Sequence, residues 1–429
     1  MVQQKEQLDL KDLIAMGVGG MVGGGIFSVL GLSVSLAGHA APLAFALGGM
    51  IALLTGWSYA RLGLTFRSDG GSFTYMEYAF RHPNVAALGG WLLMVGYIGT
   101  LALYAYTFSA YGSAMLGNHK HNPAMQHLLE SGILLVFLSV NLYGIRAAGH
   151  TEDVIVIIKV VILSLFATVG LFYVKHDYLL PVFNQGEIGL LMGSALIFVA
   201  YEGFELIPNA VNEMKDPQRH LPIAIMVSIS ITLTLYILVS LVAVGNLLPE
   251  EIVKYKEYIL AVAAKPFLGH AGFLLISLSA LLSTASAINA TMFGTARLGK
   301  VMAEDCALPR AFLISERTKE IPWLSLCIIT GLTLVFVNLG NLAVISAFAS
   351  STFLLIFGIV NVAAFRLRQH INIKPIIPML GALSCLASWV VLVGYLWLHD
   401  KSSLKWMLIF YLGIIFFEFL YSRRRSFFE

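Results

Sequence analysis

The 429-residue sequence contains few charged residues. Lys, Arg, Asp and Glu together make up 12% of it, whereas a soluble domain carries roughly 25%. Hydrophobic residues supply 58% of the chain. So little charge cannot cover the surface of a globular protein of this length. The composition therefore excludes an ordinary soluble protein.

Cysteines and linker-like stretches are also scarce. The three cysteines are widely spaced and two lie in apolar segments, so they predict neither a disulfide framework nor a metal site. No Pro/Ser-rich linker occurs, and no connection is long enough for a separate soluble domain. We therefore expect one membrane domain over residues 1–429, without a cofactor or a nucleic-acid partner. The cysteines are Cys306, Cys327 and Cys385.

Long apolar runs dominate the rest of the sequence. A membrane-spanning helix needs about 20 mostly apolar residues, whereas the strands of a membrane barrel alternate over about ten. Continuous runs predict an all-α polytopic membrane protein, and we expect the first run to be retained. The twelve predicted spans are residues 12–38, 41–66, 86–116, 128–147, 152–174, 187–212, 221–247, 271–298, 322–339, 342–365, 376–398 and 404–422.

The positive charges are distributed unevenly between the connections. Most Lys and Arg residues fall in connections on the side of the N-terminus. Because cytoplasmic loops are enriched in these residues, we predict that both termini are cytoplasmic and that the protein lies in the cell membrane. Lys159 is an exception, since it lies within the apolar segment DVIVIIKVVILSLF.

The first apolar segment is interrupted by glycine. Residues 17–31, GVGGMVGGGIFSVLG, contain seven glycines, and each lowers helix stability by about 1 kcal/mol relative to alanine. Close packing of helices through small residues is one interpretation. The other is an unwound midpoint at Gly23, Gly24 and Gly25. Its free N–H groups would receive a carboxylate, and the carbonyls around Gly20 to Val22 would receive an ammonium.

The sixth apolar segment contains a second interruption. In FVAYEGFELIPNAVNE, Gly203 and two acidic residues stand where an apolar helix should continue. Interrupted helices in corresponding positions indicate an inverted repeat of five plus five helices, over 12–174 and 187–366, followed by two helices in 376–422. Non-helical backbone at membrane depth must be buried or line a cavity. We expect the two interruptions to form a small polar site closed by Phe198, Phe204 and Tyr104.

Three ionisable residues at membrane depth have competing interpretations. Lys159 either snorkels to the cytoplasmic interface or is a buried amine that binds and releases a proton. Glu202 and Glu205 either lie in a wet vestibule or serve proton binding, gating or attraction of a cation. For Glu205 we favour gating.

Other polar groups offer little chemistry. His119, His121 and His127 share one predicted outer loop, but we predict no metal site there. An enzyme would need a nucleophile with a base, a metal or paired acids. Ser283, Thr284 and Ser286 have no intramembrane histidine or obvious base beside them in the sequence, so we do not expect an enzyme.

Two stretches carry a resemblance to a known family. The pattern GxxxGGGIF at Gly19–Phe27 resembles the G-[SA]-G-I-F signature of the amino acid-polyamine-organocation (APC) transporters. YEGFE, followed by NEMKDPQRHLP, resembles the sixth-helix signature and the following loop of that family. The likeness covers the whole chain. AVAAKPFLG at 261–269, with SAINATMFGTARL after it, resembles an archaeal, proton-coupled family member of broad amino acid specificity.

The resemblance implies the inverted-repeat fold with helices 1 and 6 broken, and it assigns roles by position. The substrate carboxylate would meet the amides of Gly24 and Gly25. Lys159 would take the place of a sodium ion, near Ser283 or Ser286, which implies proton rather than sodium coupling. Glu205 matches a gating glutamate of the family's arginine/agmatine exchanger. The substrate amine would meet carbonyls of Met21, Val199 and Glu202, beside Gly203.

The resulting hypothesis is a proton-coupled symporter of amino acids that works by alternating access in the lipid bilayer, as a monomer or homodimer. The alternative in the same class is an amino acid or polyamine exchanger. Glu202 and Glu205 depart from the broad-specificity relative, which has no acidic residues there, so a cationic substrate stays open. A transporter-like sensor, or a subunit that needs a partner chain, is the third hypothesis.

Overall fold

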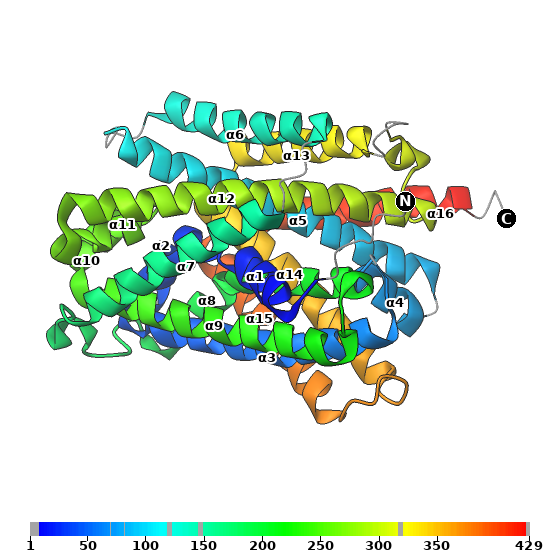
Figure 1. The fold of residues 1–429 in the computed structure, drawn as a ribbon, viewed down its shortest axis with the longest axis horizontal. Coiled ribbons are helices and arrows are strands. Elements are labelled where there is room, and N and C mark those ends of the chain that lie inside the picture. The colour runs from blue at the N-terminus through cyan, green and yellow to red at the C-terminus, as the bar shows by residue number, and fades with distance from the viewer. Residues whose placement is uncertain are drawn as a thin grey trace.

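The structure is a computed structural model, and it describes residues 8–68, 70–80, 82–117, 122–144, 149–315 and 321–425. Within these ranges the backbone is predominantly helical, and the one isolated β-bridge joins Leu8 to Met214. The long helices run side by side along the longest axis of the molecule (Figure 1). The predicted all-α class is confirmed.

The helical elements follow the predicted apolar segments in chain order. In the first half they are α1 (Leu10–Met21), α2 (Gly25–Ala37), η1 (Gly38–Ala40), α3 (Ala41–Thr65), α4 (Ser72–Phe80), α5 (Pro83–Met115), α6 (Pro123–Tyr143), α7 (Gly149–Leu171), η2 (His176–Leu179), α8 (Gly186–Leu196), η3 (Phe198–Tyr201) and η4 (Phe204–Glu213). In the second half they are α9 (Pro217–Asn246), α10 (Pro249–Lys254), α11 (Ile259–Ala263), α12 (Lys265–Glu304), η5 (Arg310–Leu313), α13 (Trp323–Leu339), α14 (Leu342–Arg366), α15 (Ile376–His399) and α16 (Lys401–Arg425).

The apolar helices make this a polytopic membrane protein. Nine described helical stretches are long and apolar enough to cross a membrane, and a tenth arises if the pair α8 and η3–η4, bent by 47°, is one span. The count of twelve stays a prediction. Each predicted segment contains a helix, but α1 and α2 have only 12 and 13 residues and α13 has 17, all fewer than the roughly 20 that a span needs.

Local sequence signals explain where several helices begin. The side chain of Asn122 accepts a hydrogen bond from the Ala124 N–H at the start of α6, and Pro123 occupies the first helical position. Asn341 caps α14 in the same way, through the Val344 N–H at 2.9 Å. These caps satisfy N–H groups that a helix start leaves without partners.

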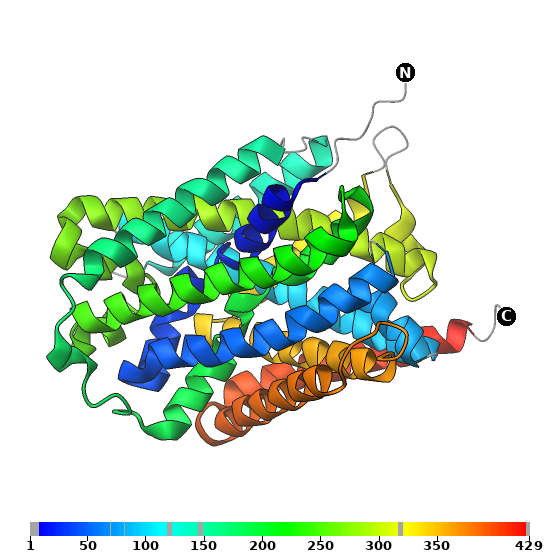
Figure 2. The same ribbon diagram turned by 60° about the horizontal axis from the view of Figure 1, so that its bottom comes forward.

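The core forms around α5 and α14. In these two helices 72% and 78% of the apolar window is buried, compared with 17% in α6 and 22% in α15. Figure 2 shows α3 (blue) lying between α9 (green) and α15 (orange), although these segments are far apart in the sequence. The outer helices expose large apolar side chains such as Leu398 and Leu412, as contact with lipid requires.

The residues just before α1 are hydrogen-bonded to the end of η4 and the segment that follows it. The Leu8 N–H donates to the Glu213 carbonyl at 2.8 Å, and the Lys215 N–H donates to the Leu8 carbonyl at 3.3 Å. Beside this bridge the Lys215 ammonium lies 2.8 Å from Asp9 and holds the pKa of that carboxyl below its usual value. The N-terminal half of segment one therefore begins in contact with segment six.

Candidate functional site

The first interruption is a short turn between α1 and α2. α1 ends at Met21 and α2 begins at Gly25. The turn is covered closely, because a Cβ added at Gly24 would lie 2.2 Å from Cδ1 of Tyr104. A Cβ at Gly25 would lie 2.8 Å from the Cα of Ala200 in η3. Glycine is required here because backbone and an aromatic ring approach the turn directly.

Carbonyls at the end of α1 receive donors from three other helices. The Lys159 ammonium on α7 donates to the Gly19 carbonyl at 2.7 Å, and the Ser283 hydroxyl on α12 donates to the Val22 carbonyl at 2.6 Å. Between them the Tyr236 hydroxyl on α9 is 2.7 Å from the Met21 carbonyl and 3.1 Å from that of Ala200. A helix end leaves such carbonyls unpaired and carries partial negative charge. Donors, and a cation in particular, are therefore favoured there.

The second interruption is longer and lies between α8 and η4. After the short 3-10 turn of η3, Glu202 is extended and Gly203 has φ +125°. A Cβ at Gly203 would lie 2.6 Å from both the carbonyl carbon of Gly20 and the N of Met21. Only glycine tolerates both this φ and this approach. The two interruptions therefore meet backbone to backbone.

The polar backbone of the second interruption is bonded mostly within segment six. The Gly203 N–H donates to Oε2 of Glu205 at 2.7 Å, and the Glu202 N–H donates to the Val199 carbonyl at 3.1 Å. From outside, the Ser350 hydroxyl on α14 accepts the Val199 N–H at 3.1 Å and donates to the Leu196 carbonyl. Glu205 thus acts as a cap for its own break.

One face of α5 lies against both interruptions. Tyr104 lies against Gly24, the Thr100 hydroxyl donates to Glu202, and the Tyr97 hydroxyl donates to Glu205 at 3.4 Å. Residues 97, 100 and 104 share a helical face because they are separated by three and four positions. Both glutamates are buried, with 4% and 2% of their surface exposed. Two acidic groups therefore lie inside the protein within reach of α5.

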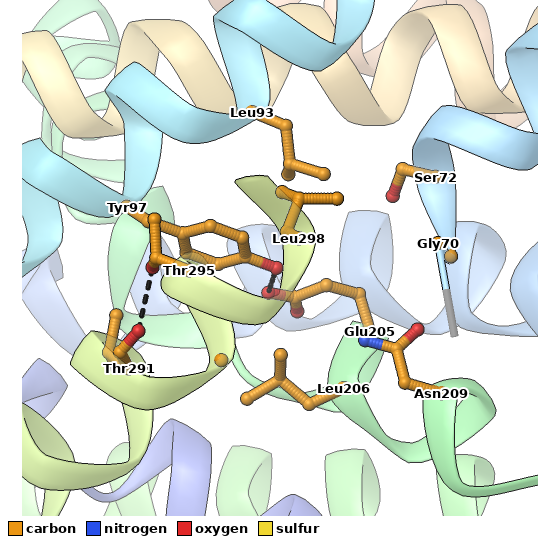
Figure 3. Close-up of a pocket in the computed structure, with 12 residues that line it drawn as sticks. Gly70, Ser72, Leu93, Tyr97, Glu205, Leu206, Asn209, Thr291, Thr295 and Leu298 are labelled. Carbon is orange, nitrogen blue, oxygen red and sulfur yellow. Dashed lines mark hydrogen bonds between the residues drawn. The ribbon is translucent and has the colours of Figure 1, made fainter. Parts of the chain in front are cut away.

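A cavity of about 40 Å³ lies beside Glu205, on the side of α4. Figure 3 shows the Glu205 carboxylate pointing toward Tyr97, with Thr291 and Thr295 of α12 on one side and Asn209 of η4 on the other. The volume is enough for a few water molecules. The twelve lining residues are Gly70, Gly71, Ser72, Leu93, Tyr97, Glu205, Leu206, Asn209, Thr291, Gly294, Thr295 and Leu298.

The structure brings the predicted substrate-binding residues into one region. Met21, Gly23, Gly24 and Gly25 form or flank the first turn, and Gly23 packs on Ala287 of α12. Val199, Glu202 and Gly203 form the second. Their role in binding stays a prediction. The Met21 carbonyl already accepts one hydrogen bond from Tyr236, and a carbonyl can accept a second.

The remaining predicted residues take different places. Lys159 is 1% exposed, and its ammonium reaches the Gly19 carbonyl near the end of α1. Its role in proton coupling stays a prediction. Ser283 bonds to Val22, and Ser286 is half-buried three residues further on. Phe198 and Phe204 pack against Phe357 of α14, with ring centroids 5.7 and 5.2 Å apart. Their gating role stays a prediction.

The sequence did not identify three residues whose hydroxyl groups bond to the interruptions, namely Tyr236, Ser350 and Thr100. Each stands in an ordinary apolar helix, where a lone hydroxyl carries no positional pattern. The one general signal is that a buried tyrosine hydroxyl usually has a hydrogen-bond partner, and this signal does not say which partner. Their function as links between helices depends on the packing of distant segments.

The predicted absence of a metal site concerns three histidines. His119 and His121 lie outside the described residues. His127 Nδ1 lies 3.3 Å from a carboxylate oxygen of Glu130. Over the described ranges, no group of three or more His, Cys, Asp or Glu residues is arranged to hold a metal ion.

The fold and the site define a multi-pass membrane protein whose two interrupted helices meet at one buried polar centre. Comparison with known proteins identifies the family. Residues 8–419 match the amino acid permease family, and the chain belongs to that family. It is an amino acid transporter, not an enzyme.

Relatives that match nearly the whole chain include two named transport proteins. An uncharacterized protein of Methanocaldococcus jannaschii is 32% identical and covers 98% of this chain and 96% of its own. The inner membrane transport protein YbaT of Escherichia coli is 31% identical, with 94% and 93% covered. The methylthioribose transporter of Bacillus subtilis is 30% identical, with 97% and 93% covered.

Proposed function

We propose that this protein takes up amino acids across the cell membrane together with protons, with both termini in the cytoplasm. The proposal rests on one observation. The Lys159 ammonium is buried and donates to the Gly19 carbonyl, three residues before the Val22–Gly24 turn. This is a position where a bound cation would stabilise the end of α1. A lysine there supplies the charge without sodium, and it carries that charge only when protonated.

Proton loss from Lys159 would change how α1 is held. A neutral amine still donates a hydrogen bond, but it no longer neutralises the negative end of the helix dipole. The contact between α7 and α1 would weaken next to the substrate site. Proton release on the inside would thereby favour opening of the inner half of segment one. Binding of a proton on the outside would favour closure.

The substrate would bind at the turn that α1 shares with α2. The first N–H groups of α2 have no partner within the helix, and they lie at its positive end. They suit a carboxylate at Gly24 and Gly25. The carbonyls of Met21, Val199 and Glu202 suit the α-amine. Tyr104, which covers Gly24, would have to move when the carboxylate enters.

Flux into proteoliposomes tests the coupling. An inward pH gradient should drive accumulation of an amino acid into vesicles that contain none, and sodium should have no effect. Lys159→Ala should lower uptake at least tenfold and abolish its dependence on external pH. Lys175→Ala is the matched control, because Lys175 is exposed outside the apolar segments, and it should behave as the unmodified protein.

Two results would contradict the proposal. Uptake that requires internal amino acid and ignores the pH gradient would establish exchange. Retention of the original pH dependence by Lys159→Ala would remove Lys159 as the proton carrier.

A further inference from the structure

The cavity beside Glu205 is rich in acceptors and lacks cations. No Lys, Arg or His occurs among the twelve described residues that line it. The side-chain oxygen of Asn209 is buried and has no hydrogen-bond donor in the described part of the chain. Glu205 accepts from the Gly203 N–H and from Tyr97, and a carboxylate has about four acceptor positions. Both residues can therefore accept further hydrogen bonds.

An ammonium group complements this lining. It has three N–H donors and no acceptor, whereas a buried carboxylate is costly unless a cation or several donors accompany it. Leu93, Leu206 and Leu298 supply apolar lining in the same cavity. Aliphatic chains that end in a cation pack their methylene groups against such surfaces and place the charge in a polar environment.

The position of the cavity sets the length of its ligand. Tyr104 lies against Gly24, the predicted carboxylate site, and Tyr97 donates a hydrogen bond to Glu205. Both tyrosines lie on the same face of α5. Seven residues of helix separate them, or about 10 Å. An extended amino acid with a four- or three-methylene side chain and a terminal amine, hydrogen-bonded at each end, matches this span.

We propose that the cavity is the subsite for a side-chain ammonium, so that the transporter prefers amino acids such as lysine and ornithine to neutral ones of equal length. Glu205 is the specificity-determining residue, and Asn209 is a second acceptor. This inference rests on the proposed transport of amino acids that bind at the turn between α1 and α2, and it adds the class of side chain.

Competition for uptake in proteoliposomes tests the inference. In the unmodified protein, lysine and ornithine should inhibit at concentrations at least tenfold lower than norleucine and Nε-acetyl-lysine, which lack the side-chain charge. Glu205→Gln should remove this preference, so that lysine and norleucine inhibit uptake at similar concentrations in the variant. Asn209→Asp, which adds a carboxylate, should strengthen lysine inhibition severalfold. Glu187→Gln, on an exposed site of α8, is the matched control.

The possible outcomes separate the two proposals. If norleucine and lysine are transported equally well, or if Glu205→Gln weakens the inhibition by both equally, the proposed ammonium subsite is wrong. Proton-coupled amino acid transport then still stands. If no amino acid competes or enters, the proposed function fails together with the inference. If Glu205→Gln cannot be purified, the preference of the unmodified protein and the effect of Asn209→Asp decide the matter.

Discussion

The two interruptions differ in what holds them. At the first, the carbonyls of Gly19, Met21 and Val22 receive donors from α7, α9 and α12. At the second, Glu205 caps Gly203 from within the same segment. The first break is therefore held mainly by other helices, and the second largely by residues of its own segment. A proton or substrate that changes the donor on one of these helices can therefore change how the end of α1 is held.

The difference follows from polarity. The end of α1 presents acceptors, so any helix that packs there must bring a hydroxyl or an ammonium. The start of η4 presents donors, and a carboxylate close in sequence can satisfy them. Within segment one the Ser28 hydroxyl donates to the Gly24 carbonyl, whereas the side-chain donors to Gly19, Met21 and Val22 come from other helices.

The largest effect should come from the point where the breaks meet. In Gly203→Ala the new Cβ would clash with Gly20 and Met21 backbone, and φ +125° adds about 1–3 kcal/mol of strain. Transport should fall more than tenfold, and the protein should unfold at a lower temperature in detergent. Gly186→Ala is the control, since Gly186 has φ +73° but open space around it. Equal effects of the two substitutions would show that backbone strain, not contact between the breaks, is what matters.

An intermediate effect is expected at the tyrosine that joins both breaks. Tyr236→Phe removes the hydroxyl between Met21 and Ala200, and a buried group left unsatisfied costs about 1–3 kcal/mol. Uptake should fall about tenfold. Tyr111→Phe loses a bond to the Phe27 carbonyl, which lies in the first turn of α2 but points toward the C-terminal end of that helix, so it should lose stability with little loss of uptake. If both variants lose uptake in proportion to stability, Tyr236 has no special place in the site.

The smallest effect concerns the contact of α5 with the second break. Tyr97→Phe removes a long hydrogen bond of 3.4 Å to Glu205, worth less than about 1 kcal/mol, because the Gly203 N–H still holds the carboxylate. Uptake should stay within about threefold of the original. Thr100→Val, which removes the closer contact to Glu202, should lower uptake more. A reversed order of these two variants, measured by initial uptake rates, would mean that Tyr97 rather than segment six positions Glu205.

Much of the site was predictable because its signals are local. Glycine runs weaken helices wherever they occur, so composition and spacing indicated an interruption near Gly23–Gly25, and the turn lies at Val22–Gly24. Lys159 was identifiable because a charge in an apolar segment needs an explanation. Its partner was not, since the Gly19 carbonyl lies 140 residues away. The cavity was not predictable either, because it forms between α5, η4, α12 and the α3–α4 connection.

By itself the sequence determined the class of protein, the apolar segments, the two interruptions and the charges at membrane depth. Hydrophobicity and helix propensity act over a few turns, and they are readable without knowing what packs against what. The tertiary structure decided that Tyr236 bridges both breaks, that Gly203 touches Gly20, and that Glu205 faces a cavity. Such contacts depend on the mutual positions of helices, and single hydroxyls or glycines do not encode those positions locally.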